Sequence, residues 1–120
     1  MPVFTRMKDN ILVLTVDGDY TPNEVRRVWL AAFEAHDRDN TIPVLLDLSG
    51  AAGLNTKTDG DWEATGAIFG AFADRIHGIA AVVSPEFFEA FQEGSVFQSR
   101  AVARVGHFSS HTDAREWLNA

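Results

Sequence analysis

The segment that most constrains the fold is the apolar run Val44-Leu45-Leu46-Asp47-Leu48, which leads into Ser49-Gly50. Its hydrophobic residues fall on both faces of a strand, a pattern typical of a central strand in a parallel sheet covered by helices. A hydroxyl-rich loop follows, and then an amphipathic helix from Trp62. Because open α/β sheets bind ligands outside the carboxyl ends of their strands, this loop is the predicted place of a binding site.

Strand and helix patterns alternate in the order ββαβαβαβα. Strands are predicted at residues 2–7, 11–16, 42–48, 79–83 and 102–108, the first two as an antiparallel hairpin that turns at Lys8-Asp9-Asn10. Strands that alternate with helices imply right-handed crossovers and parallel pairing. We therefore predict an α/β fold with a single-layer, mostly parallel five-stranded sheet, an antiparallel N-terminal edge strand and helices packed outside.

The helix starts are marked by capping residues. In Thr21-Pro22-Asn23-Glu24, Thr21 suits the cap, Pro22 the first helical position and Glu24 a capping box. A second helix is predicted from Thr58 or Asp59 to Ile76, with Gly78 in the left-handed position beyond its end. Ser84-Pro85-Glu86 predicts the start of a third helix, and Ser110-His111-Thr112-Asp113 that of the last.

Composition narrows the classes of partner and site. The net charge of −7 disfavours a nucleic-acid backbone or an anionic membrane as a partner, and the absence of cysteine excludes disulfides and thiolate metal sites. Residues 1–8 lack the apolar region of a signal peptide. We expect a single domain over residues 1–120, located in the cytoplasm.

These patterns, in their order and spacing, resemble the SpoIIAA-like domains of the STAS superfamily, typified by bacterial anti-sigma-factor antagonists. The resemblance rests on Gly18-Asp19 before a capped helix, Val44-Leu45-Leu46-Asp47-Leu48-Ser49-Gly50, Ser84-Pro85, Phe91, Gly94, Phe97, Phe108, Asp113-Ala114 and Trp117-Leu118. It implies a non-catalytic regulatory module that binds a protein partner. A more distant similarity reaches the CRAL-TRIO lipid carriers, which bind apolar ligands.

The phosphorylated motif of such antagonists, Asp-Ser-Ser/Thr-Gly, falls on Asn55-Thr56-Lys57-Thr58. Here Asn55 replaces the carboxylate and Lys57 the usual phosphoacceptor, whereas an alignment shifted by one residue places Thr56 or Thr58 at the acceptor position. Ser49, Thr56, Lys57, Thr58 and Asp59 form the candidate loop for a partner or an anion, because a helix N-terminus favours negative charge. Simple capping by Thr58 or Asp59 is the competing interpretation.

A second candidate surface is aromatic. Phe87 and Phe88 are about 100° apart on a helix and cannot both face inward with Phe91, so Phe87, Phe88, Phe91 and Phe97 suggest a dimer face or the lid of an apolar pocket. A wide buried stripe would explain them equally well.

Other polar groups receive structural interpretations. His107 and His111 fall in a strand and at a helix start without a third ligand, so no metal site is predicted. Ser110, His111 and Asp113 are too close in sequence for a catalytic triad and are predicted to cap. Asp17-Gly18-Asp19 and Asp59-Gly60-Asp61 lack the further ligands of a calcium loop.

Three functions remain open from the sequence. The first is a partner-binding module that uses residues 49–61, and the second is a carrier or sensor of a small apolar ligand, which the Phe and Trp content favours. The third is an enzyme in which Glu63, Asp47 or a histidine acts as acid or base; we expect no catalytic residue and no cofactor, since no nucleophile is paired with a base in the sequence.

Overall fold

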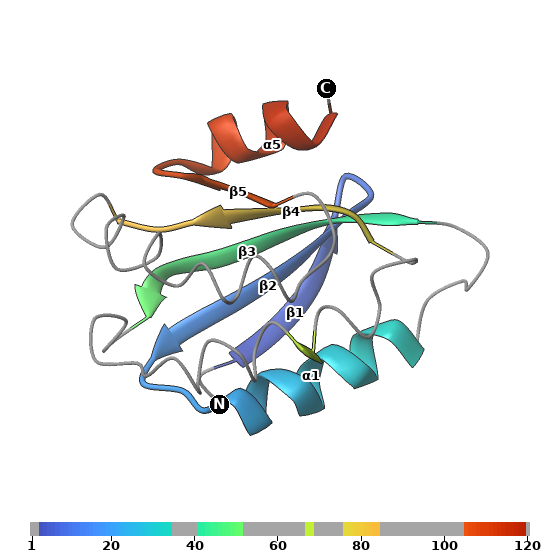
Figure 1. Ribbon diagram of the computed structural model, residues 1–120, viewed down its shortest axis with the longest axis vertical. Coiled ribbons are helices and arrows are strands. Elements are labelled where there is room, and N and C mark those ends of the chain that lie inside the picture. The colour runs from blue at the N-terminus through green and yellow to red at the C-terminus, as the bar shows by residue number, and fades with distance from the viewer. Residues whose placement is uncertain (1–2, 35–40, 52–66, 69–75, 85–104, 120) are drawn as a thin grey trace.

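The computed structural model describes residues 3–34, 41–51, 67–68, 76–84 and 105–119. Figure 1 shows the elements, which are β1 (Val3–Lys8), β2 (Ile11–Gly18), α1 (Pro22–Glu34), β3 (Ile42–Ala51), β4 (Ile76–Val82), β5 (Val105–Phe108) and α5 (His111–Asn119). Residues 67–68 are helical. No described helix is long and apolar enough to cross a membrane.

The strands form one five-stranded sheet in the order β1-β2-β3-β4-β5. β1 pairs with β2 in antiparallel fashion, and each later pair is parallel. The predicted α/β fold, with an antiparallel N-terminal edge strand, is confirmed. Parallel pairing brings the carboxyl ends of β2 to β5 to the same edge of the sheet, where the chain leaves β3 at Ala51 and enters α5 after Phe108.

The hairpin between β1 and β2 turns at two residues. Asp9 and Asn10 both have positive φ, 53° and 65°, and Lys8 pairs with Ile11. Two consecutive left-handed residues define a type I′ turn, whose twist matches that of the flanking strands. Asp and Asn tolerate this conformation better than other residues with a side chain, which explains the turn predicted at this point.

α1 covers one face of the sheet and begins where the sequence predicts. Thr21 Oγ1 accepts a hydrogen bond from the Glu24 backbone N–H at 3.3 Å and donates one to Glu24 Oε1 at 3.2 Å. Inside the helix, Trp29 and Phe33 are 0% and 2% exposed, with ring centroids 4.7 Å apart. They belong to a core whose other fully buried members include Val3, Leu12, Leu14, Val16, Val44, Ile79, Ala81 and Val83.

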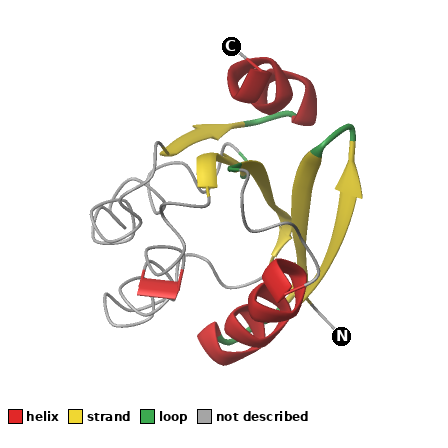
Figure 2. Cartoon of the chain, turned by 90° about the vertical axis from the view of Figure 1, so that its right-hand side faces the viewer, coloured by secondary structure: helices red, strands yellow, loops and turns green. Residues whose placement is uncertain are grey.

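α5 covers the opposite face, and Figure 2 shows the two helices on either side of the sheet. Its Ala114 and Leu118 pack on the strand residues that alternate with those of the first core, namely Ile11, Val13, Leu45, Ala80 and Val82. Successive side chains of a strand point to opposite faces. A strand with apolar side chains on both faces therefore needs a helix on each side, as the sequence of β3 predicts.

The start of β4 corrects the sequence-based prediction. Ile76, His77 and Gly78 were expected at the end of the second helix, but all three lie in β4. Ile76 is buried and His77 exposed, which is the alternation of a strand. Ile76 is also four residues from Phe72, so its spacing alone fits a helix equally well. The pairing of β4 with the first residues of β3 decides between them.

Pro43 explains an irregularity in that pairing. The register shifts between Ile42, which pairs with Ile76, and Pro43, which pairs with Gly78. Proline lacks the N–H needed for a regular ladder and occurs in sheets at bulges or at the first residues of strands. The shift lies at the amino end of β3, so the remainder of the strand pairs regularly with β4 up to Asp47 and Val82.

Candidate functional site

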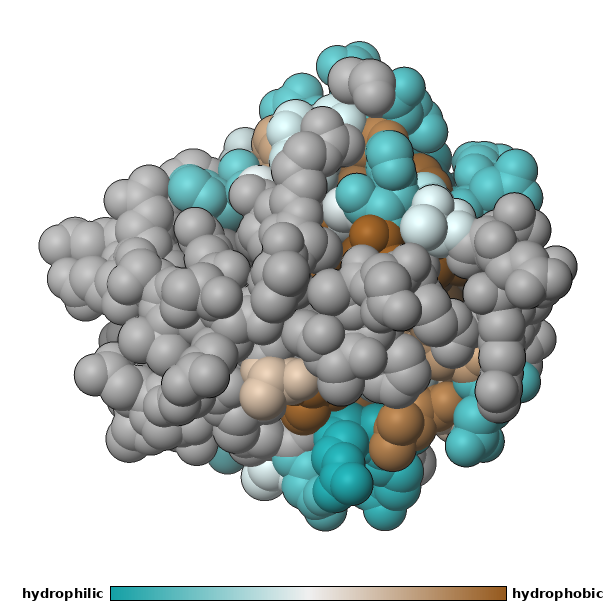
Figure 3. All heavy atoms as spheres, turned by 45° about the vertical axis from the view of Figure 1, so that its right-hand side comes forward, coloured by the Kyte–Doolittle hydropathy of each residue, from teal (hydrophilic) through white to brown (hydrophobic). Residues whose placement is uncertain are grey.

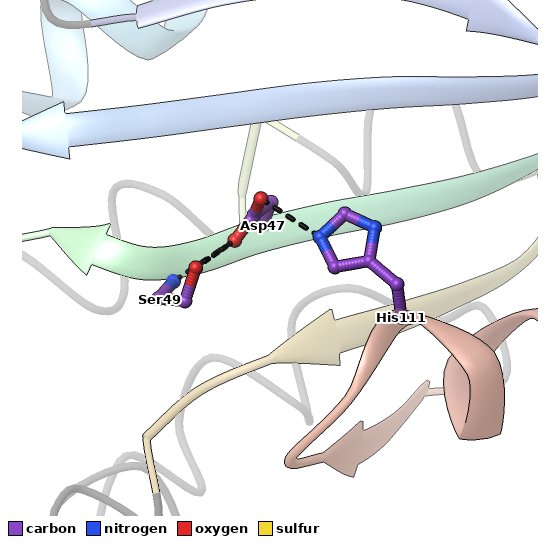
Figure 4. A network of polar contacts seen from close by, with 3 residues as sticks. All are labelled: Asp47, Ser49 and His111. Atoms are coloured by element: carbon purple, nitrogen blue, oxygen red, sulfur yellow. Dashed lines mark hydrogen bonds and ion pairs between the residues drawn. The ribbon is translucent and has the colours of Figure 1, made fainter.

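The carboxylate of Asp47, near the carboxyl end of β3, contacts two other polar side chains. Its Oδ1 accepts hydrogen bonds from Ser49 Oγ at 2.6 Å and from the Ser49 backbone N–H at 3.0 Å. Its Oδ2 lies 2.9 Å from Nε2 of His111, which is 64 residues away in the sequence. Figure 4 shows the three side chains, with Asp47 in the middle. We call them the Asp47 cluster.

A bulge in β3 gives Ser49 its position. Thr15 pairs with Asp47, and Asp17 with Gly50, so three steps along β3 oppose two steps along β2. The additional residue disrupts the regular ladder at this point, as β-bulges do. The Ser49 N–H instead donates a hydrogen bond to the carboxylate of Asp47, two residues earlier. Asp favours turns through local bonds of this kind. Ser49 itself is exposed.

Gly50 follows the bulge and lies beside the Asp17 side chain of β2. A Cβ at this position would lie 3.0 Å from Asp17 Oδ1 and 3.5 Å from the Val16 carbonyl oxygen. A side chain at this position would require the Asp17 carboxylate to shift slightly, whereas its contact with the backbone of β2 would be an ordinary one. The polar end of β3 is held by its pairing with β2 and by the hydrogen bonds from Ser49 to the Asp47 carboxylate.

Capping of α5 fixes the third member of the cluster. The Asp113 backbone N–H donates to Ser110 Oγ at 3.2 Å, and the Ala114 N–H donates to the Ser110 carbonyl oxygen at 3.2 Å. Ser110 is therefore the N-cap, which confirms the capping prediction. His111 is the first residue of the helix and projects onto β3.

The electrostatics favour an ionised carboxylate. Burial acts to raise the pKa of Asp47, but hydrogen bonds from the Ser49 hydroxyl, the Ser49 N–H and His111, together with the charge of His111, lower it below the ordinary value of 3.8. An ionised carboxylate only accepts hydrogen bonds, so Nε2 of His111 carries the proton in this contact. The side chains of Asp47 and His111 are 15% and 40% exposed.

The order of contacts determines what chemistry the cluster supports. In a nucleophilic triad, histidine takes the proton of serine and the carboxylate orients the histidine. Here the Ser49 hydroxyl donates to Asp47, and His111 occupies the other carboxylate oxygen. Among the described residues, the only base in contact with Ser49 Oγ is that carboxylate. The cluster is suited to holding an exposed hydroxyl in one orientation and to linking β3 with α5.

The site predicted from the sequence is only partly within the described residues. Ser49 lies at the carboxyl end of the sheet, as predicted, whereas Thr56, Lys57, Thr58 and Asp59 lie outside the described residues. Phe87, Phe88, Phe91 and Phe97 lie outside them too, as do Asp59-Gly60-Asp61 and Glu63. The loop and the aromatic surface therefore stay predictions.

The remaining polar candidates have local explanations. His107 lies in β5 and His111 in α5, as predicted, and the described residues contain no group of three or more metal-ligating side chains. Gly18 has φ of 78°, and Asp19 Oδ1 accepts from the Tyr20 N–H at 3.0 Å, so Asp17-Gly18-Asp19 forms the exit from β2.

The contact between Asp47 and His111 was not predicted. The sequence does contain a relevant signal, because Asp47 is a charged residue inside an otherwise apolar central strand. A helix that follows a parallel strand begins at the carboxyl edge of the sheet, so His111 and Asp47 share that edge. Which strand the first turn of α5 faces depends on its packing across the sheet.

A hollow of about 310 Å³ lies on the outer face of α1. It is lined by Asn23, Arg26, Arg27, Leu30, Ala31 and Glu34. In Figure 3, strongly hydrophilic atoms of the described residues gather at the bottom of the molecule, over α1, beside hydrophobic ones. The hollow is open to solvent and combines charged groups with Leu30 and Ala31, so it is not the enclosed apolar pocket that a lipid carrier needs.

Comparison with known proteins identifies the class. The model of the SpoIIAA-like family matches residues 11–119. The chain belongs to this family, as the resemblance seen in the sequence predicted. No curated protein matches the chain.

A solved structure has the same fold. It is that of an uncharacterized protein of the DUF3478 family with a SpoIIAA-like fold, from Shewanella loihica PV-4. The TM-score is 0.66 at 16% sequence identity, and the match covers 97% of this chain and 91% of the other. Family and fold together support a STAS-type α/β module.

Proposed function

We propose that the protein is a non-catalytic binding module that contacts a protein partner at the carboxyl edge of its sheet. The proposed surface consists of Ser49, the loop that follows β3 and the first turn of α5. The observation that carries the proposal is the Asp47 cluster, which holds an exposed hydroxyl against a carboxylate that is itself fixed to α5.

The geometry favours binding over catalysis. A side chain held in one orientation before binding loses little conformational entropy when it meets a partner. Ser49 offers such a group, and exposed residues of α5 such as Thr112 and Asp113 lie at the same edge. His111, in contrast, contacts the carboxylate and does not contact the hydroxyl, so the cluster lacks the arrangement of a serine nucleophile and its base.

The proposal is tested by photo-crosslinking in cells of the organism that makes the protein. A benzophenone amino acid is introduced at Thr112, beside the proposed surface, or at Asn10, in the turn at the opposite edge of the sheet. We expect one partner protein to be cross-linked in stoichiometric amounts to the variant with benzophenone at Thr112. The variant with benzophenone at Asn10 should not capture it. Introducing Ser49→Arg into the Thr112 variant should abolish the capture, because a bulky cation replaces the oriented hydroxyl.

Two controls separate binding from folding. The Ser49→Arg protein must unfold in urea at a midpoint close to that of the Ser49→Ala protein, which loses the same hydroxyl without added bulk. A partner captured equally from Asn10, or one that still binds Ser49→Arg, would show that the contact surface lies elsewhere.

A further inference from the structure

We propose that two copies of the chain associate through β1, edge to edge and antiparallel, so that their sheets become continuous. β1 is the first strand of the sheet order, and no described strand pairs with its outer side. Figure 2 shows this outer edge of the sheet open. An open edge strand presents unpaired N–H and C=O groups and is a template for another strand.

The hairpin register shows which backbone groups are available. In a two-residue hairpin the pair that flanks the turn, here Lys8 and Ile11, is hydrogen-bonded, and hydrogen-bonded pairs alternate along the ladder. Phe4, Arg6 and Lys8 therefore direct their backbone groups towards β2. Val3, Thr5 and Met7 direct theirs outwards.

The exposed side chains of β1 need an explanation. Phe4 and Met7 are 48% and 43% exposed, and they are two of the three large hydrophobic residues that are exposed in the described part of the chain. Arg6 is exposed as well. Phe4 and Arg6 lie on the same face of the sheet, because they are two residues apart in a strand.

One register makes β1 complementary to a second copy of itself. If Thr5 pairs with Thr5 of the copy, Val3 pairs with Met7 of the copy. Every outward backbone N–H and C=O of these residues then has a hydrogen-bond partner. Phe4 then faces Arg6 of the copy as a non-hydrogen-bonded pair, in which side chains are closest. Twofold symmetry creates this contact between a guanidinium and an aromatic ring twice.

The alternative symmetric registers are less favourable. Shifting the pairing towards Lys8 sets Arg6 against Arg6, which is a like-charge pair. Shifting it towards Val3 leaves Met7 without a partner among residues 3–8. Charged residues on an edge strand normally discourage pairing, but in the proposed register Arg6 meets an aromatic ring and no second cation. The strand therefore selects a second copy in one register.

The register is tested by cross-linking. The chain contains no cysteine, so Thr5→Cys introduces a single thiol on the proposed twofold axis, at the Cα separation that a disulfide needs. We expect this variant, without an N-terminal tag, to form a covalent dimer under mild oxidation. Met7→Cys, on the same strand, should not, because Met7 faces Val3 of the copy. Dimers from Met7→Cys but not from Thr5→Cys would overturn the proposed register.

The energetics are tested by sedimentation equilibrium. The wild-type chain should form dimers as its concentration rises. Phe4→Arg should raise the dimer dissociation constant about tenfold or more, because two arginine pairs replace two cation–ring contacts. The double variant Phe4→Arg/Arg6→Glu should restore association, since each new arginine then faces a glutamate. Thr5→Pro removes an outward N–H without removing a hydrogen bond to β2, and should also weaken the dimer.

Three results would overturn the proposal. The first is a wild-type monomer at every concentration. The second is a dimer that Phe4→Arg and Thr5→Pro leave unchanged, which would place the interface on another surface. The third is a β1 edge that pairs with a strand of a different protein while the chain alone stays monomeric.

Discussion

His111 Nε2 lies 2.9 Å from Asp47 Oδ2 and joins the first turn of α5 to the central strand β3. α5 follows the last strand and packs mainly over β4 and β5, on the face of the sheet opposite α1. The contact links this helix to β3 as well. It also fixes the carboxylate that orients Ser49. One side-chain pair thus contributes both to the packing of the C-terminal helix and to the geometry of the proposed surface.

A double-mutant cycle measures this contact. We expect Asp47→Ala, His111→Ala and the double variant to yield a coupling free energy of about 0.5–1.5 kcal/mol in urea unfolding, the net value of one partly exposed hydrogen bond. Asp47→Ala should cost more than His111→Ala, because it also frees the Ser49 donors. A cycle of Asp47 with the exposed Glu116 serves as the control and should show no coupling. Additive effects of Asp47 and His111 would mean that the contact contributes nothing to stability.

Acidification should weaken the contribution of Asp47. Its pKa is lower in the folded chain than the ordinary value of 3.8, so the unfolded chain binds more protons near that pH. The carboxylate therefore stabilises the fold above this range, and the benefit is lost as the pH falls through the folded value. The difference in unfolding free energy between the wild type and Asp47→Asn should narrow as the pH falls below about 4.

The pH experiment has a direct readout as well. The carboxyl resonance of Asp47, followed by NMR, should titrate below 3.8. The stability profile of Glu116→Gln, which removes an exposed carboxylate from α5, corrects for the change in net charge. An Asp47 titration above 3.8, or a difference that widens in acid, would contradict the assigned hydrogen bonds.

Two leucines provide a matched test of the core. Leu45 is 0% exposed in β3, while Leu30 is 37% exposed on α1. Leu45→Ala should lower the free energy of unfolding by about 2–5 kcal/mol, because it leaves a cavity between the sheet and α5. Leu30→Ala should cost below about 1 kcal/mol. Urea unfolding followed by circular dichroism measures both, and equal losses would show that β3 is not central.

In the turn between β1 and β2, two substitutions of Asn10 should have different effects on the stability of the fold. Asn10 has φ of 65°, a conformation that glycine adopts freely and a β-branched residue does not. Asn10→Gly should leave stability unchanged or raise it by up to about 1 kcal/mol, whereas Asn10→Val should lower it by about 1–2 kcal/mol. Thermal unfolding of the two variants gives the comparison. A stable Asn10→Val protein would argue against a type I′ turn.

Local patterns were sufficient to predict much of the framework. Thr21 and Ser110 cap the helices they were expected to cap, and the apolar run on both faces of β3 indicated a sheet covered on both sides. Local patterns failed at Ile76, His77 and Gly78. The spacing of Ile76 from Phe72 suits a helix and its alternation with His77 suits a strand, so only pairing with β3 distinguishes the two.

The sequence by itself determined the elements whose cause lies within a few residues: caps, the place of the first hairpin turn, the buried central strands, and hence the family. Tertiary structure alone decided that His111 reaches Asp47, because their separation of 64 residues is bridged only by the packing of α5 on the sheet. It also decided the position of Ser49, since the bulge in β3 exists only as a mismatch of register with β2. Contacts between distant segments depend on how strands align and helices pack, and a local sequence pattern does not determine that alignment.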